Sequence, residues 1–188
     1  MLKREQAIEI LNKNLKNKNL FKHCLAVEAA MKGLAEKLNG NVEKWGLIGL
    51  LHDGDWEITK DDHANHAKKM VEWLKQSDET DNEILNAILS HNWQHDGFRQ
   101  PNSLMEWALF CCDELTGLIV AIALVMPDKK LASVSVESVL KKFPSKNFAA
   151  GVNREQIKMC EEKLGIKLSE FVDIVLKSMQ IINSELGL

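Results

Sequence analysis

Apolar residues recur at helical spacing through nearly every long segment of this chain, and this periodicity is the strongest constraint on its fold. Between residues 21 and 38, for example, His23, Val27, Met31 and Leu34 fall on one face of a helix. The alternation of polar and apolar residues that marks a strand is confined to one short segment, ASVSVES. The pattern therefore predicts an all-α fold: one helical bundle with additional helices at its C-terminal end.

The expected helices are separated by residues that favour turns and caps. Asp61 and Asp62 are plausible N-caps for a helix that runs on to residue 76. The segment NWQHDGFRQPNS reads as a loop, and ASVSVES fits a short strand or the start of a helix. The remaining helices are expected at about residues 42–53, 81–91, 104–126, 154–164 and 169–185.

Composition excludes several classes of partner and predicts a cytoplasmic protein. A chain of 188 residues with a net charge of -3 suits a single domain, 1–188, and offers no basic surface for nucleic acid or for a membrane. The first twenty residues are charged throughout, unlike a signal peptide, and the uncharged apolar run 115–126 is too short to span a bilayer. The four cysteines have no metal-site spacing and are expected to be free thiols.

An apolar run, GLIGLL, ends abruptly in His52 and Asp53. Burying a carboxylate costs several kcal/mol unless it is paired or bound to a metal, so something should hold Asp53. Two other expected helices also place a metal-ligand type among apolar neighbours, namely His23 and Asp113. Imidazole and carboxylate together suit Mn, Fe, Co, Ni, Zn or Mg.

Each of these residues has a simpler interpretation when it is taken alone. His23 would then be a satisfied core histidine, Asp113 the partner of a lysine, and His52 with Asp53 a helix end that turns into solvent. The occurrence of all four in one short helical chain favours a common site.

The order and context of these residues resemble the HD-domain superfamily of metal-dependent phosphohydrolases. The segments that carry the resemblance are HCLAVEAAM, GLIGLLHDGDWE and CCDELTGLI, which match the family pattern H…HD…D. The resemblance covers about residues 20–126 as the metal-binding core, and it leaves 127–188 as a helical extension packed on that core. The stretches KKLASVSVESVLKKF and FAAGVNRE resemble a subgroup of small HD proteins of the HDIG type.

By this resemblance, His23, His52, Asp53 and Asp113 are metal ligands. One divalent ion is expected, and two are the alternative, because some HD proteins bind a second ion through extra histidines between the HD pair and the last aspartate. His63, His66 and His91 lie in that interval. His63 and His91 occupy the usual positions, and His66, one turn beyond His63, is its substitute. Asn92 departs from a subset of two-metal relatives that has a histidine there.

The candidate catalytic residues are Asp53, Asp55 and His91. Asp55 and Glu57 add negative charge after the HD pair, and either could act as a general base or orient a metal-bound water, although a solvated loop would also explain Glu57. His91 would be a ligand or a hydrogen-bond donor to a phosphate. The candidates for binding a phosphate are Lys129, Lys130 and Arg154. Ordinary surface charge is the alternative explanation for each of them.

The expected function is therefore hydrolysis of a small phosphomonoester or phosphodiester, nucleotide-like in character, by a metal-activated water. The alternatives are a di-iron oxygenase on the HD fold and a non-enzymatic HD module that senses a nucleotide or binds a partner. The apolar tail helix FVDIVLKSMQII would dock on the domain or on a second copy, which leaves a homodimer as an expectation.

Overall fold

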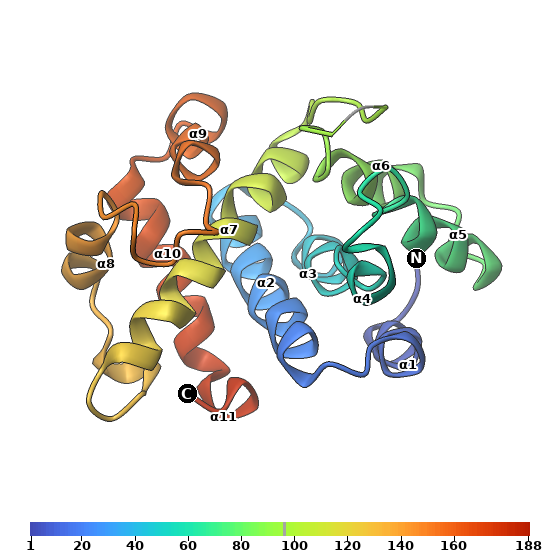
Figure 1. Ribbon diagram of the computed structural model, residues 1–188. Helices are drawn as coiled ribbons and strands as arrows, with labels where there is room; N and C mark the ends of the chain where they lie inside the picture. The colour runs from blue at the N-terminus through green and yellow to red at the C-terminus, as the bar shows by residue number, and fades with distance from the viewer. Residues whose placement is uncertain (96) are drawn as a thin grey trace.

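The computed structural model describes residues 1–95 and 97–188, and all regular structure within these ranges is helical. Two long helices, α2 (Lys18–Lys37) and α7 (Leu104–Val125), run through the middle of the molecule and pack on each other (Figure 1). The all-α prediction is confirmed.

The other helices flank this central pair on two sides (Figure 1). The N-terminal side holds α1 (Arg4–Asn14), α3 (Val42–Leu51), α4 (Trp56–Thr59), α5 (Lys68–Gln76) and α6 (Asn82–Ser90). The C-terminal side holds the 3-10 turn η1 (Leu131–Ser133), α8 (Val136–Lys142), α9 (Arg154–Leu164), α10 (Leu168–Ile181) and α11 (Asn183–Leu186).

Close packing of α2 on α3 places the two histidines of these segments next to each other. Gly49 of α3 lies directly on α2: a Cβ atom built there would stand 2.7 Å from the carbonyl oxygen of Val27 and 2.9 Å from the side chain of Met31. Only glycine permits this approach of the two backbones. The ring centroids of His23 and His52 are consequently 5.1 Å apart.

By length and composition, α7 is the one helix in the described ranges that is long and apolar enough to cross a membrane. The sequence had indicated that the uncharged apolar run 115–126 is too short to span a bilayer. That run is only part of the helix, because Asp113 and Glu114 interrupt the apolar sequence without ending the helix. Of its most apolar window, 61% is buried inside the protein, as in a core helix. It packs on α2, α9 and α10.

The tail helix α10 packs on the protein's own core, against α2 and α7. Its apolar face is buried through Phe171, Val175 and Met179. The helix ends at Ile181, and the short α11 follows, where the sequence had predicted one continuous helix to residue 185.

The expected helix from Asp61 or Asp62 is the clearest error of the sequence interpretation. Residues 60–67 form turns, and α5 begins only at Lys68, after Ala67 adopts a positive φ of 66°. Ala67 has no side chain that can cap the helix. The carboxylate of Asp55 does so from another segment, accepting a hydrogen bond from the backbone N–H of Met70 at 2.9 Å.

Two further segments differ from or refine the expectations. The helix α1 was not predicted, and the alternating segment 132–138 forms the end of η1 and the start of α8, capped by Ser135, rather than a strand. The four cysteines are free, as predicted, and all are buried.

Candidate metal centre

Four histidines and two aspartates converge where α2, α3, α6 and α7 meet. His23 lies on α2 and Asp113 on α7, and His91 caps the C-terminus of α6. His52 caps the C-terminus of α3, and the chain turns at once after it. This turn allows His52 and Asp53, which would diverge on a continuous helix, to face one centre.

One donor group consists of His23, His52 and Asp113, whose ligand atoms all lie within 4.8 Å of one another. The Oδ1 atom of Asp113 is 3.0 Å from Nε2 of His23 and 3.5 Å from Nε2 of His52.

The second donor group consists of Asp53, His66 and His91. The Oδ1 atom of Asp53 is 3.2 Å from Nε2 of His66 and 3.5 Å from Nε2 of His91. His66 reaches this group because residues 60–67 form turns instead of a helix.

Asp53 joins the two groups. Its Oδ1 atom faces His66 and His91 and also lies 3.7 Å from Nε2 of His52, whereas Oδ2 lies 3.6 Å from Nε2 of His23. A carboxylate placed in this way can contribute one oxygen to each of two neighbouring cations.

Hydrogen bonds behind the rings fix the tautomers of His66 and His91. The Nδ1 atom of His66 lies 2.8 Å from Oδ1 of Asp55, and Nδ1 of His91 contacts the carbonyl oxygen of Ile88. Because a carboxylate and a carbonyl only accept, both Nδ1 atoms carry a proton. The Nε2 atoms of the neutral rings therefore present lone pairs to the centre.

The same arrangement holds at His23 and His52. Nδ1 of His52 donates to the carbonyl oxygen of Gly49 at 2.8 Å. Nδ1 of His23 lies 3.4 Å from Oγ1 of Thr116, whose own proton goes to the carbonyl oxygen of Asp113. Metal-binding histidines are typically oriented by such a bond at the other ring nitrogen.

The donor set fits a divalent cation and is poorly satisfied without one. The Nε2 atom of His52 is fully buried and has no hydrogen-bond partner, although it faces the carboxylates of Asp53 and Asp113. Four imidazole lone pairs and two carboxylates that point at one another repel unless a cation lies among them. Mixed nitrogen and oxygen donors suit first-row divalent ions.

In the absence of metal, protons take the place of that cation. Burial lowers the pKa of His52, but Asp53 and Asp113 outweigh it and raise this pKa to about 9. Burial also lowers the pKa of His66, but Asp53 and Asp55 outweigh it and raise this pKa to about 9. Burial raises the pKa values of Asp53 and Asp113, yet the histidines, His52 first among them, hold both well below the usual range.

Asp55 lies behind the centre and does not face it. Its Oδ1 atom accepts from His66 and its Oδ2 atom accepts from the N–H of Met70, and its side chain is fully buried. Both oxygens are thus occupied away from the cavity. This geometry does not support the general base that the sequence suggested, and it makes Asp55 a residue that orients His66.

His63 is outside both donor groups, and His66 takes the position for which His63 was the first candidate. The ring of His63 stacks on His95 with centroids 4.7 Å apart and contacts Trp56 at 5.5 Å.

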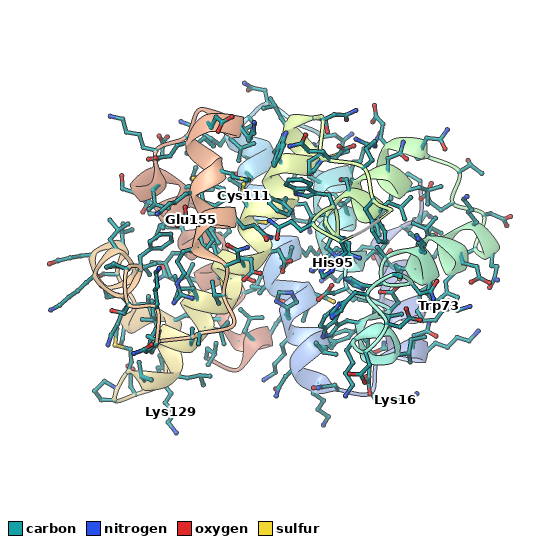
Figure 2. All side chains as sticks on the ribbon, turned by 45° about the horizontal axis from the view of Figure 1, so that its top comes forward. Lys16, Trp73, His95, Cys111, Lys129 and Glu155 are labelled. Atoms are coloured by element: carbon teal, nitrogen blue, oxygen red, sulfur yellow. The ribbon has the colours of Figure 1, made fainter. Side chains whose placement is uncertain are left out.

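The three candidate phosphate-binding residues do not line the cavity at the centre. Lys129 and Lys130 are exposed beyond the C-terminal end of α7, and Figure 2 shows Lys129 far from His95. Arg154 instead holds the preceding loop together. Its guanidinium donates to the carbonyl oxygens of Phe143, Phe148, Ala149 and Val152.

A cavity of about 380 Å³ opens onto the two donor groups, a size typical of small-ligand sites. Sequence reasoning missed several of its walls, among them Phe110, Glu114 and Asn153. Glu114 accepts from the backbone N–H of Asn153 at 2.9 Å and so ties the loop before α9 to α7. The adjacent acidic pair Asp113–Glu114 was the available signal for Glu114, whereas nothing local marks Asn153.

Comparison with known families agrees with this geometry. The sequence model of the HD domain matches residues 20–118, which is more than half of the chain, and the protein therefore belongs to the HD-domain family. The matched region contains all six residues of the two donor groups. A search of curated proteins found no match to this chain.

Proposed function

We propose that this protein is a metal-dependent phosphohydrolase that binds two divalent ions and acts on a small phosphomonoester or phosphodiester. The observation that carries the proposal is the bridging position of Asp53 between the groups His23/His52/Asp113 and His66/His91. Two-metal sites of this kind stabilise both the attacking and the leaving oxygens in phosphoryl transfer.

The charge of the cavity supports an anionic substrate only when metal is present. Asp53, Asp113 and Glu114 line it, and no lysine or arginine does so among the residues described. A phosphate ester would meet the carboxylates of Asp53 and Asp113, together with Glu114, whose pKa burial and Asp113 raise to about 7, and no fixed cation other than protonated histidine. Divalent ions reverse this balance, and they would supply a water of lowered pKa together with an electrophile for the phosphoryl oxygens.

The protein's own residues would orient and enclose the reacting groups. Asp55 and Thr116 hold His66 and His23 in the required tautomers. Trp56 and Phe110 form apolar walls that limit access of bulk water to the centre. The amide side chain of Asn92 is anchored through a bond to the carbonyl oxygen of His63.

Elemental analysis and an activity panel together test the proposal. Protein purified without chelators should contain close to two equivalents of a divalent first-row metal and should hydrolyse phosphomonoesters or phosphodiesters. Asp53→Ala should lose both metal and activity. Asp61→Asn removes a carboxylate from an exposed turn and serves as the matched control, with both properties retained.

Two results would contradict the proposal. Metal-dependent turnover that survives Asp53→Ala would show that the reaction occurs elsewhere. Stoichiometric iron combined with oxygen consumption, and no hydrolysis of any phosphate ester, would assign the centre to oxidation instead.

A further inference from the structure

A second cavity, of about 480 Å³, lies next to the metal centre along α7. The two cavities share His23 and Gly117, so they meet at a ligand of the first donor group. The second cavity, here called the α7 groove, has polar lining residues from α2, Asn19 and Lys22, beside His23. Its apolar walls come from two other parts of the chain: Val120, Leu124, Leu186 and Leu188. The segment around α11 that supplies the last two lies between the lower ends of α7 and α2 (Figure 1).

Gly117 stands at the junction of the two cavities and has no packing role. A Cβ atom built there would meet only Val152, at an ordinary contact distance of 3.8 Å. The glycines of α2 and α3 differ, because a Cβ atom at Gly33, Gly46 or Gly49 would stand less than 3.0 Å from a neighbour. A glycine inside a helix lowers helix stability relative to alanine. At Gly117 no close approach compensates for that loss, and the missing side chain leaves space where the two cavities adjoin.

Three of the four apolar walls of the α7 groove are accessible, and the fourth, Leu186, is buried. Leu124 is 51% exposed, and Val120 and Leu188 are half-buried. Apolar side chains that line a cavity next to a polar centre are suited to the apolar part of a ligand whose polar part binds at that centre. The volume of the groove suits a short substituent on a soluble molecule.

We propose that the substrate is a phosphate ester with a short apolar substituent, and that this substituent passes Gly117 into the α7 groove while the phosphate binds at the metal centre. The inference rests on the proposed function, because it takes the phosphate to be held by the two donor groups. Gly117 and Leu124 are then specificity-determining residues: the first keeps the passage open and the second lines the groove.

Binding of alkylphosphonates to the metal-replete protein tests this, with methylphosphonate, n-butylphosphonate and n-hexylphosphonate as probes in calorimetric titrations. These compounds carry the same anionic head and are not hydrolysed. Each methylene that leaves water should tighten binding by about fourfold. Hexylphosphonate should therefore bind at least about tenfold more tightly than methylphosphonate even if only two methylenes enter the groove.

Three variants locate the effect. Gly117→Leu should bring the ratio of the two affinities close to one, because the new side chain fills the passage. Leu124→Ser should reduce the ratio by removing an apolar wall at an exposed position that does not threaten the fold. Val125→Ser is the matched control. Val125 is next to Leu124 in the chain and is 61% exposed, but it does not line the groove, so the ratio should not change.

The outcomes separate this inference from the proposed function. Equal binding of methylphosphonate and hexylphosphonate would overturn the apolar substituent while leaving phosphate binding at the metal centre in place. Failure of all three probes to bind metal-replete protein would overturn both. A chain-length effect that persists in Gly117→Leu and Leu124→Ser would show that the alkyl chain lies elsewhere, and it would overturn the assignment of the groove.

Discussion

The Nε2 atoms of His66 and His91 face each other across 3.0 Å, while the Nδ1 atom of each ring is committed to an acceptor behind it. Two neutral rings held in this way present lone pairs to each other, so the arrangement requires a proton or a metal ion beside Asp53. This pair is the observation that favours a second ion in the proposed function, beyond the single-ion site that His23, His52, Asp53 and Asp113 would form.

Replacement of His91 by alanine should remove one metal equivalent and leave the other. The substitution takes away a ligand of the second donor group, whereas His23, His52 and Asp113 remain in place. Elemental analysis of the purified variant provides the measurement. His63→Ala is the control, and its metal content should equal that of the native protein because His63 lies outside both groups. Equal metal loss in the two variants would contradict the assignment.

Replacement of Asp55 by asparagine should weaken metal binding without touching a ligand. The variant loses the charged acceptor that fixes the tautomer of His66. Loss of such an orienting partner typically lowers metal affinity by about ten- to a hundredfold. Competition with a chromophoric chelator measures this change, with Asp61→Asn as the control for charge. If the affinity of Asp55→Asn matches that of the native protein, His66 does not act as a ligand.

Metal binding should release protons at neutral pH. In the metal-free protein the pKa values of His52 and His66 are raised to about 9, so both rings are protonated at pH 7 and must lose their protons when an ion binds. Metal affinity should therefore increase as the pH rises towards 9. Titration calorimetry in buffers of different ionisation enthalpy counts the protons; a count near zero would contradict these pKa values.

The same raised pKa values make the stability of the metal-free protein depend on pH. A group with a higher pKa in the folded state binds its proton more tightly there, and the resulting stabilisation is complete below the unfolded value of about 6.5. It is then lost as the pH rises through about 9. Urea unfolding of chelated protein should show this decline between pH 6.5 and 9, and metal-replete protein should show less of it.

Replacement of Arg154 by alanine should destabilise the protein and leave its metal content unchanged. Its guanidinium satisfies carbonyl oxygens of Phe148, Ala149 and Val152, and each lost bond of this kind costs about 1 kcal/mol. Denaturant unfolding should show a loss of about 1–3 kcal/mol. Lys129→Ala, at an exposed position, should stay within about 0.5 kcal/mol of the native value.

Replacement of Gly117 by alanine should stabilise the fold, in contrast to most glycine substitutions in this protein. Alanine is preferred over glycine inside a helix by about 0.5–1 kcal/mol, and the new Cβ atom meets only Val152 at 3.8 Å. Gly49→Ala should have the opposite effect because its Cβ atom would stand 2.7 Å from the backbone of α2. Denaturant unfolding of the metal-free variants measures both changes in the free energy of unfolding. A loss of stability in Gly117→Ala would show that Gly117 has a packing role.

The helical architecture could be predicted from the sequence because each helix carries its own periodicity and caps. Asp81 caps α6 and Ser103 caps α7 through side-chain bonds to backbone N–H groups within three residues. Such signals are local, so the bounds of α6, α7 and α9 agree with the prediction to within one residue. The start of α5 was predicted wrongly because its capping residue is Asp55, which lies fifteen residues from the N–H group that it binds.

The sequence by itself determined the helical class and the HD family, because residue type and order along the chain carry that information. It also predicted His23, His52, Asp53 and Asp113 as one set of ligands, and the fold brings these four side chains together. Tertiary structure alone decided that His66 rather than His63 joins the second donor group, since this depends on the break before α5. It also decided that Arg154 binds carbonyl oxygens of the preceding loop and that a second cavity lies beside His23 and Gly117. These features arise from contacts between segments distant in the chain, which no local pattern encodes.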